Sequence, residues 1–170
     1  MIEIRDSTRD DAAEIALVNA AAWRTAYKGV VEDSILAGLP VAQWAREIAG
    51  HIDGISGDSF SWVATEGDEV VGSCYVAAPG REEPADSDVA ELVAIYVHPD
   101  RWRQGVGSLL LSEAISRAGE RGYREMVLWT FEQNDAARSF YWRHGFQADG
   151  GESRFMPGDV PTISMRRPLG

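Results

Sequence analysis

The sequence predicts an α/β (α+β) fold in which one domain, residues 1–170, carries a mixed central sheet flanked by helices. Three observations lead to this class. Segments with strand-like and helix-like hydrophobic spacing follow one another along the chain, and such an alternation builds a sheet with helices packed on it. The chain has 170 residues, 45% hydrophobic and 25% charged, as in ordinary globular proteins. No repeat or linker divides it.

The N-terminal part of the chain predicts one strand and three helices. Residues 2–5 alternate between apolar and polar side chains, as a short strand does. Ser7 or Thr8 then caps a helix whose apolar positions recur with the helical period. Two further helices are expected at residues 32–37, closed by a glycine and a proline, and at residues 41–52.

The middle of the chain predicts a hairpin, a surface loop and a third strand. Residues 60–65 and 70–78 have strand character, and a Glu-Gly-Asp-Glu turn joins them. Residues 79–88 are polar and acidic and predict a surface loop. Residues 89–97 form another apolar strand, which stops before Pro99 because proline lacks a backbone donor.

The C-terminal part predicts two helices and three strands. In order, these are a helix from about residue 105 to residue 121, a strand at 125–131, a helix at 134–144, and short strands at 146–148 and 162–166.

The entrance to the helix after Pro99 has the features of a phosphate-binding loop. Gly105 and Gly107 allow the backbone to approach a ligand closely. The helix start adds unpaired N–H groups and the positive end of the helix dipole. Arg101 and Arg103 flank the loop, and at least one of them is expected to contact phosphate.

Single residues exclude or disfavour other kinds of site. Ser108 stands where a P-loop needs a lysine directly after its last glycine, and Leu110 stands where the dinucleotide fingerprint has its third small residue. Lys28 is the only lysine, which disfavours pyridoxal phosphate chemistry. Cys74 is the only cysteine, so we expect neither an internal disulfide nor a metal site.

The charge balance restricts the partners. A net charge of −11, from 27 acidic and 16 basic residues, repels nucleic acid and anionic membranes. No apolar run reaches the roughly 18 residues of a membrane span, and the charged N-terminus lacks a signal-peptide core. We therefore expect a cytoplasmic protein without nucleic-acid or membrane partners. The net charge and the acidic residues 82–86 favour a cationic small substrate.

A second segment, the helix at residues 134–144, supports the interpretation of this loop. Asn134 caps the helix at 134–144, and Ala137, Phe140 and Tyr141 share one face of it. By itself this is a packed amphipathic helix. Together, however, Trp102-Arg103-Gln104-Gly105-Val106-Gly107 and Asn134-Asp135-Ala136-Ala137-Arg138-Ser139-Phe140-Tyr141 resemble motifs A and B of the GCN5-related N-acetyltransferase (GNAT) superfamily. The resemblance covers residues 89–146 well.

This resemblance implies an acyl-CoA N-acyltransferase-like fold, with a mostly antiparallel sheet that splays between the strands at 89–97 and 125–131. It implies acetyl-CoA as cosubstrate and no metal. Backbone groups of Ile95 and Val97 would pair with the pantetheine arm, and Asn134 would contact the pantetheine or adenine side. The pyrophosphate would lie on backbone N–H groups of six consecutive residues: Arg103, Gln104, Gly105, Val106, Gly107 and Ser108. Trp102 occupies the position that is Arg or Gln in motif A. The side-chain contact that the resemblance implies at this position is therefore not expected in this chain.

Two residues are candidates for proton transfer. Tyr141 is the candidate general acid, because a tyrosine hydroxyl with a pKa of about 10 can protonate a leaving thiolate. Glu91 lies 14 residues before Gly105, which is the position of a carboxylate base in some family members. Strand alternation places Glu91 on the same face as Ile95 and Val97. Each candidate also has a structural interpretation, as a core tyrosine and as an exposed strand-end glutamate.

The sequence therefore predicts an acetyl-CoA-dependent N-acetyltransferase that acts on a primary amine of a small molecule or peptide by direct attack in a ternary complex. The alternative is a non-catalytic acyl-CoA-binding or regulatory module with the same fold. Trp23, Tyr27 and Trp129 could line an acceptor pocket or belong to the core. The residues leave the identity of the amine open, and they leave a homodimer possible.

Overall fold

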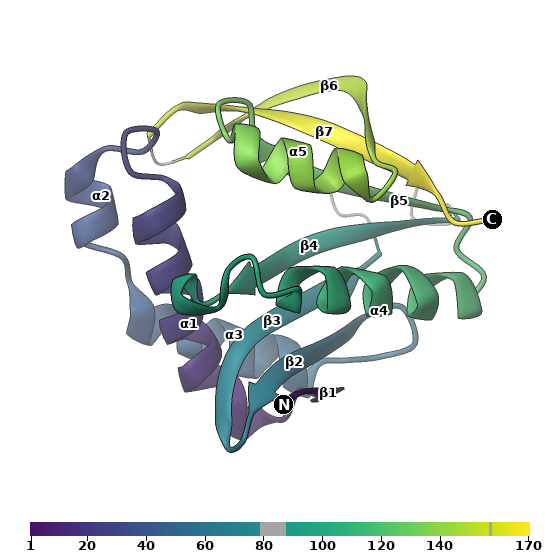
Figure 1. Ribbon diagram of the computed structural model, residues 1–170, viewed down its shortest axis with the longest axis horizontal. Coiled ribbons are helices and arrows are strands. Elements are labelled where there is room, and N and C mark those ends of the chain that lie inside the picture. The colour runs from purple at the N-terminus through teal and green to yellow at the C-terminus, as the bar shows by residue number, and fades with distance from the viewer. Residues whose placement is uncertain (79–87, 157) are drawn as a thin grey trace.

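The protein is a seven-stranded sheet covered by helices on both faces, seen in a computed structural model that describes residues 1–78, 88–156 and 158–170. The strands lie in the order β1-β2-β3-β4-β5-β7-β6 (Figure 1). Their bounds are β1 (Ile2–Asp6), β2 (Phe60–Glu66), β3 (Glu69–Ala77), β4 (Val89–Val97), β5 (Glu125–Phe131), β6 (Gln147–Phe155) and β7 (Val160–Pro168). The helices are α1 (Ala12–Ala26), α2 (Asp33–Ala37), α3 (Val41–Asp53), α4 (Val106–Glu120) and α5 (Asp135–Arg143).

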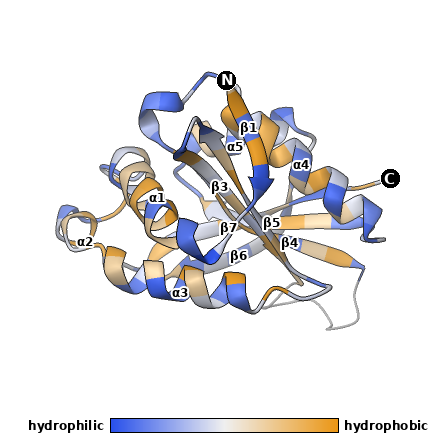
Figure 2. Ribbon diagram, turned by 90° about the horizontal axis from the view of Figure 1, so that it is seen from below, coloured by the Kyte–Doolittle hydropathy of each residue, from blue (hydrophilic) through white to orange (hydrophobic). Residues whose placement is uncertain are grey.

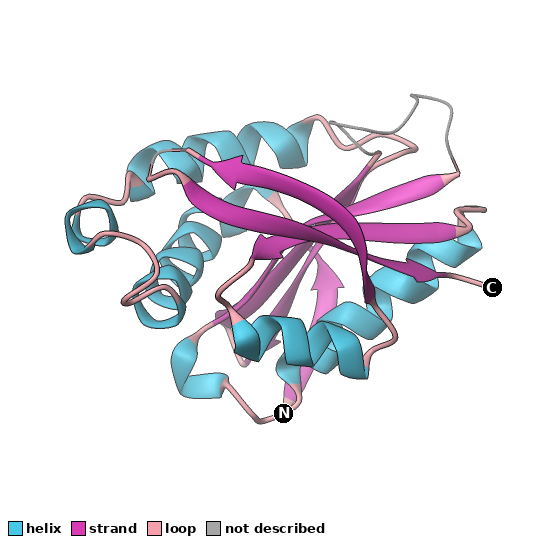
Figure 3. Cartoon of the chain, turned by 90° about the horizontal axis from the view of Figure 1, so that it is seen from above, coloured by secondary structure: helices cyan, strands magenta, loops and turns pink. Residues whose placement is uncertain are grey.

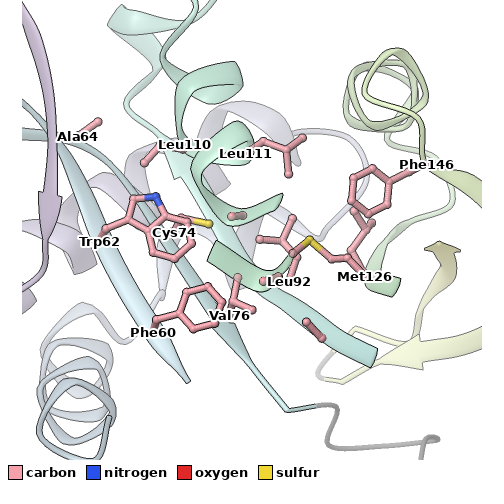
Figure 4. Close-up of a cluster of buried hydrophobic side chains, with 14 of the residues drawn as sticks. Phe60, Trp62, Ala64, Cys74, Val76, Leu92, Leu110, Leu111, Met126 and Phe146 are labelled. Atoms are coloured by element: carbon pink, nitrogen blue, oxygen red, sulfur yellow. The ribbon is translucent and has the colours of Figure 1, made fainter. Parts of the chain in front are cut away.

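Two groups of helices cover the two faces of the sheet. α4 and α5 lie on one face, and α1 with α3 lies on the other (Figures 1 and 3). Hydrophobic and hydrophilic residues alternate along α3, as an amphipathic surface helix requires (Figure 2). The main core lies between the sheet and α4 and includes Trp62, Leu110, Leu111, Met126 and Phe146 (Figure 4). The mixed sheet with helices on both faces confirms the predicted fold class.

The sheet opens between β4 and β5. Five of the six neighbouring strand pairs are antiparallel, and β4 and β5 form the parallel one. The β4–β5 ladder begins at Val89↔Glu125 and ends at Leu92↔Leu128. Beyond this point the two strands diverge, although each continues to its own end. The predicted splay is therefore confirmed, and it leaves one side of β4 without a neighbouring strand.

A β-bulge interrupts β4 at the start of this opening. Leu92 pairs with Val76 and Ala94 pairs with Tyr75, so Val93 is an extra residue opposite the β3 partner strand. The bulge reverses the alternation of side chains. Leu92 before it and Ile95 after it both pack into the α4 core, whereas Tyr96 packs with residues of α1 on the opposite face.

The C-terminal hairpin is longer than the sequence predicts. β6 and β7 each span nine residues, where we expected short strands at 146–148 and 162–166. The sequence of β6, QADGGESRF, lacks hydrophobic alternation because β6 is a largely exposed edge strand. Asp149 fixes its irregular centre by accepting hydrogen bonds from Gly151 N, Ser164 Oγ and Arg166 Nε. Pairing with β7, which the local sequence does not reveal, makes this segment a strand.

Candidate active site

An open cleft of about 740 Å³ lies where β4 and β5 separate. Five elements and the loop before α4 contribute to its wall. The described lining residues are Ala22, Thr25 and Ala26 of α1 and its C-cap Tyr27; Leu92, Val93, Ala94, Ile95, Tyr96 and Val97 of β4; Arg101, Trp102, Arg103, Gly105, Gly107 and Ser108 around the start of α4; Trp129 and Thr130 of β5; and Asn134, Ala136, Ala137, Phe140, Tyr141 and Arg143 of α5 and its cap.

The edge of β4 supplies backbone groups to this cleft. His98 N donates to Val71 O at 2.8 Å. In an antiparallel pair, this means that the neighbouring residues Val97 of β4 and Gly72 of β3 lie opposite each other without a hydrogen bond between them. By the two-residue period of a strand, the same holds for Ile95 opposite Cys74. The N–H and C=O groups of Ile95 and Val97 therefore point away from β3 and toward the opening. This is the arrangement that pairing with an extended ligand needs.

The turn into α4 has the geometry of an anion site. Gly105 caps the helix with φ +86°, a left-handed conformation that glycine adopts without strain, and no atom lies within 4 Å of where its Cβ would be. The first-turn N–H groups of this 15-residue helix meet the cleft at Gly107 and Ser108. Gln104 and Val106 are not among the described residues that line the cleft: the side chain of Val106 is buried in the core, and Gln104 Nε2 donates to Asp100 O.

The two arginines of the loop have different roles. Arg101 donates through Nε and an Nη atom to Glu66 Oε2, at 2.9 and 2.6 Å, and thereby ties the loop to the β2–β3 hairpin. Arg103 lies at φ 61° beside Gly105, and no ion pair with the described residues engages its guanidinium. Arg103 is therefore the better candidate for contact with phosphate.

Trp102 closes part of the opening. Its indole Nε1 donates to Val97 O at 2.7 Å, and the side chain lines the cleft while 37% exposed. This residue departs from motif A, and its hydrogen bond explains what it does instead. The indole N–H is hydrogen-bonded to one of the β4 carbonyl groups that have no partner strand where the sheet opens. The carbonyl keeps a second lone pair for another donor.

Asn134 combines a structural role with a place in the cleft. Its Oδ1 accepts from Ala137 N at 3.1 Å and so caps α5. The amide group retains its two N–H donors, and the residue lines the cleft.

Three tyrosines from different parts of the chain line the opening: Tyr27 at the end of α1, Tyr96 of β4 and Tyr141 of α5. Burial raises the pKa of Tyr141 well above its usual value, and Tyr96 and Cys74 add to the increase. Burial likewise raises the pKa of Tyr27, to which Tyr96 and Tyr141 contribute. Although α5 and α1 lie on opposite faces of the sheet, Tyr141 and Tyr27 line the same cleft at the gap between β4 and β5. All three hydroxyls remain protonated near neutral pH.

The structure places Glu91 differently from its expected position. The bulge at Val93 puts Glu91 on the face of β4 opposite to Ile95 and Val97, because each bulge reverses the alternation. Glu91 pairs with Ala77 of β3 and therefore faces the side that α1 covers. It is not among the described residues that line the cleft. The expectation of a shared face is thus wrong, since it assumed an unbroken strand.

Other residues in the cleft had no clear signal in the sequence. Tyr96 was not a candidate, because an unbroken alternation would have turned it into the core. Arg143 follows the motif B tyrosine, and only the placement of α5 brings it to the cleft.

Within the described part of the chain, no three His, Cys, Asp or Glu residues are grouped so that they could hold a metal ion. Burial raises the pKa of the Cys74 thiol well above its usual value, as expected for a core residue.

The described part of the chain contains no helix long and apolar enough to cross a membrane. The acidic residues 82–86, which favour a cationic substrate, lie outside the described residues.

Comparison with known proteins gives consistent matches. A family profile described as "Acetyltransferase (GNAT) family" matches residues 22–146. A probable N-acetyltransferase of Mycobacterium tuberculosis is 26% identical over 171 residues, which cover 97% of this chain and 92% of that protein. An uncharacterized N-acetyltransferase of Bacillus subtilis is 31% identical over 137 residues, covering 79% and 74%.

Solved structures match over the whole chain. The PaiA N-acetyltransferase of Thermoplasma acidophilum, crystallised in complex with coenzyme A, has a TM-score of 0.78 at 21% identity, and the match covers 99% of each chain. An N-acetyltransferase of Staphylococcus aureus has a TM-score of 0.77 at 18% identity, covering 100% of this chain and 99% of the other. At these identities the structural likeness shows the fold.

Proposed function

Because this chain belongs to the acetyltransferase (GNAT) family, we propose that it transfers the acetyl group of acetyl-CoA to a primary amine by direct attack in a ternary complex. The observation that carries this proposal is one continuous cleft. It runs from the start of α4, past the exposed edge of β4, to the three tyrosines in the gap between β4 and β5.

The donor side of the cleft fits a phosphate-bearing thioester with an extended arm. The N–H groups at the start of α4 and the Arg103 guanidinium favour a pyrophosphate there. The backbone groups of Ile95 and Val97 can pair with amides of the arm as a neighbouring strand would. The Asn134 amide adds a donor on the α5 side. When bound, acetyl-CoA supplies the activated acetyl group.

In the proposed reaction, the amine nitrogen forms a bond to the acetyl carbon and the carbon–sulfur bond breaks. The sulfur must then receive a proton. We assign this to the Tyr141 hydroxyl, which is protonated at neutral pH because burial raises its pKa. The same burial destabilises a thiolate and raises the pKa of its thiol, which offsets the raised pKa of the Tyr141 donor.

The amine must lose a proton before or during attack. Glu91 lies on the face of β4 that α1 covers, one residue before cleft-lining Leu92. We propose that Glu91 receives this proton. Because Glu91 is not among the described lining residues, the proton would pass through an intervening water molecule rather than directly.

The test combines binding and turnover. Calorimetry with acetyl-CoA and a thiol-release assay with a panel of amines should both give signals for the wild type. Tyr141→Phe should lower kcat by about 100-fold or more, the usual contribution of a general acid, and leave the Kd for acetyl-CoA within about twofold. Tyr123→Phe is the matched control, because the Tyr123 hydroxyl bonds Asp58 O away from the cleft. The absence of acetyl-CoA binding to the wild type would overturn the proposal.

The alternative function is a non-catalytic acyl-CoA-binding module, and the same experiment distinguishes it. Such a module would bind acetyl-CoA with no amine-dependent thiol release. Equal loss of binding and turnover in Tyr141→Phe would instead assign Tyr141 a structural role. A pH profile adds a further check, because the raised pKa of Tyr141 predicts no loss of activity from its ionisation below about pH 10.

A further inference from the structure

The two ends of the cleft differ in charge. The described lining residues include three arginines, Arg101, Arg103 and Arg143, and no aspartate or glutamate. Arg101 and Arg103 lie in the loop before α4, and Arg143 lies on α5, whose neighbouring residues pack into the α4 core. The charged residues of the described wall therefore belong to the donor side.

The acceptor side can be identified by strand alternation. Met126 and Leu128 of β5 pack into the α4 core, so Trp129 faces the opposite side of the sheet, as its neighbour Phe131 does. On β4 the bulge turns Tyr96 to this same side. Together with three residues of α1 and its C-cap Tyr27, they form the acceptor wall: Ala22, Thr25, Ala26, Tyr27, Tyr96 and Trp129. None of these six side chains carries a formal charge.

A rigid aromatic cluster supports this wall. The Tyr27 ring lies edge-on to Phe131 and to Trp23, with centroid distances of 4.6 and 4.7 Å. Trp23 in turn contacts Phe155 of β6, at 5.4 Å. The acceptor wall is therefore backed by packed rings from α1, β5 and the C-terminal hairpin, and its shape is fixed by the core rather than by a loop.

Resting on the proposed function, we infer that the acceptor is a small primary monoamine with an uncharged, aromatic or aliphatic body, and not a polyamine or a basic peptide. Burial among apolar groups disfavours the ammonium form of the bound amine, so it promotes the neutral form that can attack. A second ammonium group on the acceptor would have the same desolvation cost. No carboxylate of the described wall offsets it, and Glu91, which lies outside that wall, is assigned to the reacting amine.

The size of the cleft agrees with a small acceptor. Pockets for small molecules measure about 300 to 1,000 Å³, and the present cleft of about 740 Å³ must also contain the thioester arm. The net charge of −11 attracts cations at long range, but the described wall that would touch the acceptor offers them no partner.

The test uses the full chain, acetyl-CoA and matched amines: phenethylamine as the aromatic monoamine, and 1,4-diaminobutane, spermidine and a lysine-rich tripeptide as the cationic set. We expect kcat/KM for phenethylamine to exceed that for each cationic amine by about tenfold or more, which corresponds to roughly 1.4 kcal/mol. The KM for phenethylamine should change little between low and high salt.

A second experiment introduces a charge at the rim of the cleft. Thr25 is an exposed lining residue, so Thr25→Glu places one carboxylate beside the acceptor. The ratio of kcat/KM for diaminobutane to that for phenethylamine should rise about three- to fivefold, as for an exposed ion pair. Thr25→Gln, which has the same length and no charge, should leave this ratio unchanged.

A wild-type preference for any of the cationic amines would overturn the inference and leave the proposed function standing. The same holds if Thr25→Gln shifts the ratio as much as Thr25→Glu does, because the acceptor wall would then not discriminate by charge. If acetyl-CoA binds and no amine of either set is acetylated, the proposed function itself fails, and the inference fails with it.

Discussion

At the scale of single residues, Asp11 organises the entry to α1. It is 8% exposed and accepts hydrogen bonds from two nitrogens of Arg5, at 2.8 and 2.7 Å. It also accepts from the backbone N–H and the hydroxyl of Thr8, at 2.7 and 3.0 Å. The hydrogen bond from Arg5 is the main reason that the pKa of Asp11 falls to about 2. The carboxylate form therefore stabilises the folded state.

Asp11→Asn should lower the free energy of unfolding by about 1 to 2 kcal/mol at pH 7, because it removes a charge-assisted interaction from a buried site. The folded-state pKa lies below the unfolded value, so the contribution is complete above about pH 4 and disappears as the pH falls toward 2. Urea unfolding at pH 7 and at pH 3 measures this difference. Asp53→Asn is the control, since Asp53 pairs with Arg9 at an exposed site. An equal loss in both variants would contradict the assignment.

At the scale of elements, the turn into α4 assigns different physical roles to its two glycines. Gly105 has φ +86° and open space around its Cβ position, so its conformation requires glycine. Gly107 has an ordinary helical conformation, and an added Cβ would lie 3.5 Å from the ring of Phe140, a normal contact. The protein itself therefore does not explain the absence of a side chain at position 107, whereas a closely approaching ligand would.

Gly105→Ala should destabilise the ligand-free protein by about 1 kcal/mol or more through its positive φ. Gly107→Ala should leave the stability of the ligand-free protein unchanged or raise it by up to about 1 kcal/mol, because alanine favours a helix over glycine, and it should weaken acetyl-CoA binding. Urea unfolding without ligand and calorimetry with acetyl-CoA separate the two effects. Unchanged affinity in Gly107→Ala would show that the ligand does not approach this position.

The elements also show what the sequence could and could not predict. Helices and buried strands such as α4 and β5 carry strong periodic patterns, and most of the predicted site residues at the start of α4 and on α5 line the cleft, although Gln104 and Val106 do not. The extent of β6 was missed, because an exposed edge strand with two glycines has no such pattern. Glu91 was assigned to the wrong face because the bulge at Val93 depends on pairing with β3. Arg101 looked like a phosphate ligand, and only the fold reveals Glu66 as its partner.

At the scale of the whole molecule, the sheet consists of two halves, β1–β4 and β5–β7, joined by a short ladder of four residue pairs. A ligand that pairs with Ile95 and Val97 would extend the contacts along β4 where β5 has turned away. Binding should then stabilise the fold in proportion to the logarithm of ligand concentration.

Hydrogen exchange tests this directly. Addition of coenzyme A should slow exchange of the Ile95 and Val97 amides by about tenfold or more, because both point into the opening. The Tyr96 amide is an internal control, since alternation directs it toward β3 and its protection should change little. Equal protection of all three amides would indicate a general rise in stability without pairing along β4.

The bulge at Val93 sets which side chains of β4 face each of the two sides of the sheet. If β4 kept Val93 but ran as an unbroken strand without the bulge, Ala94 and Tyr96 would turn into the α4 core in step with Leu92. Ile95 and Val97 would then face α1 in place of tyrosine. The bulge thus lets β4 direct the apolar side chains of Ile95 and Val97 to the core and the Tyr96 side chain to the acceptor side.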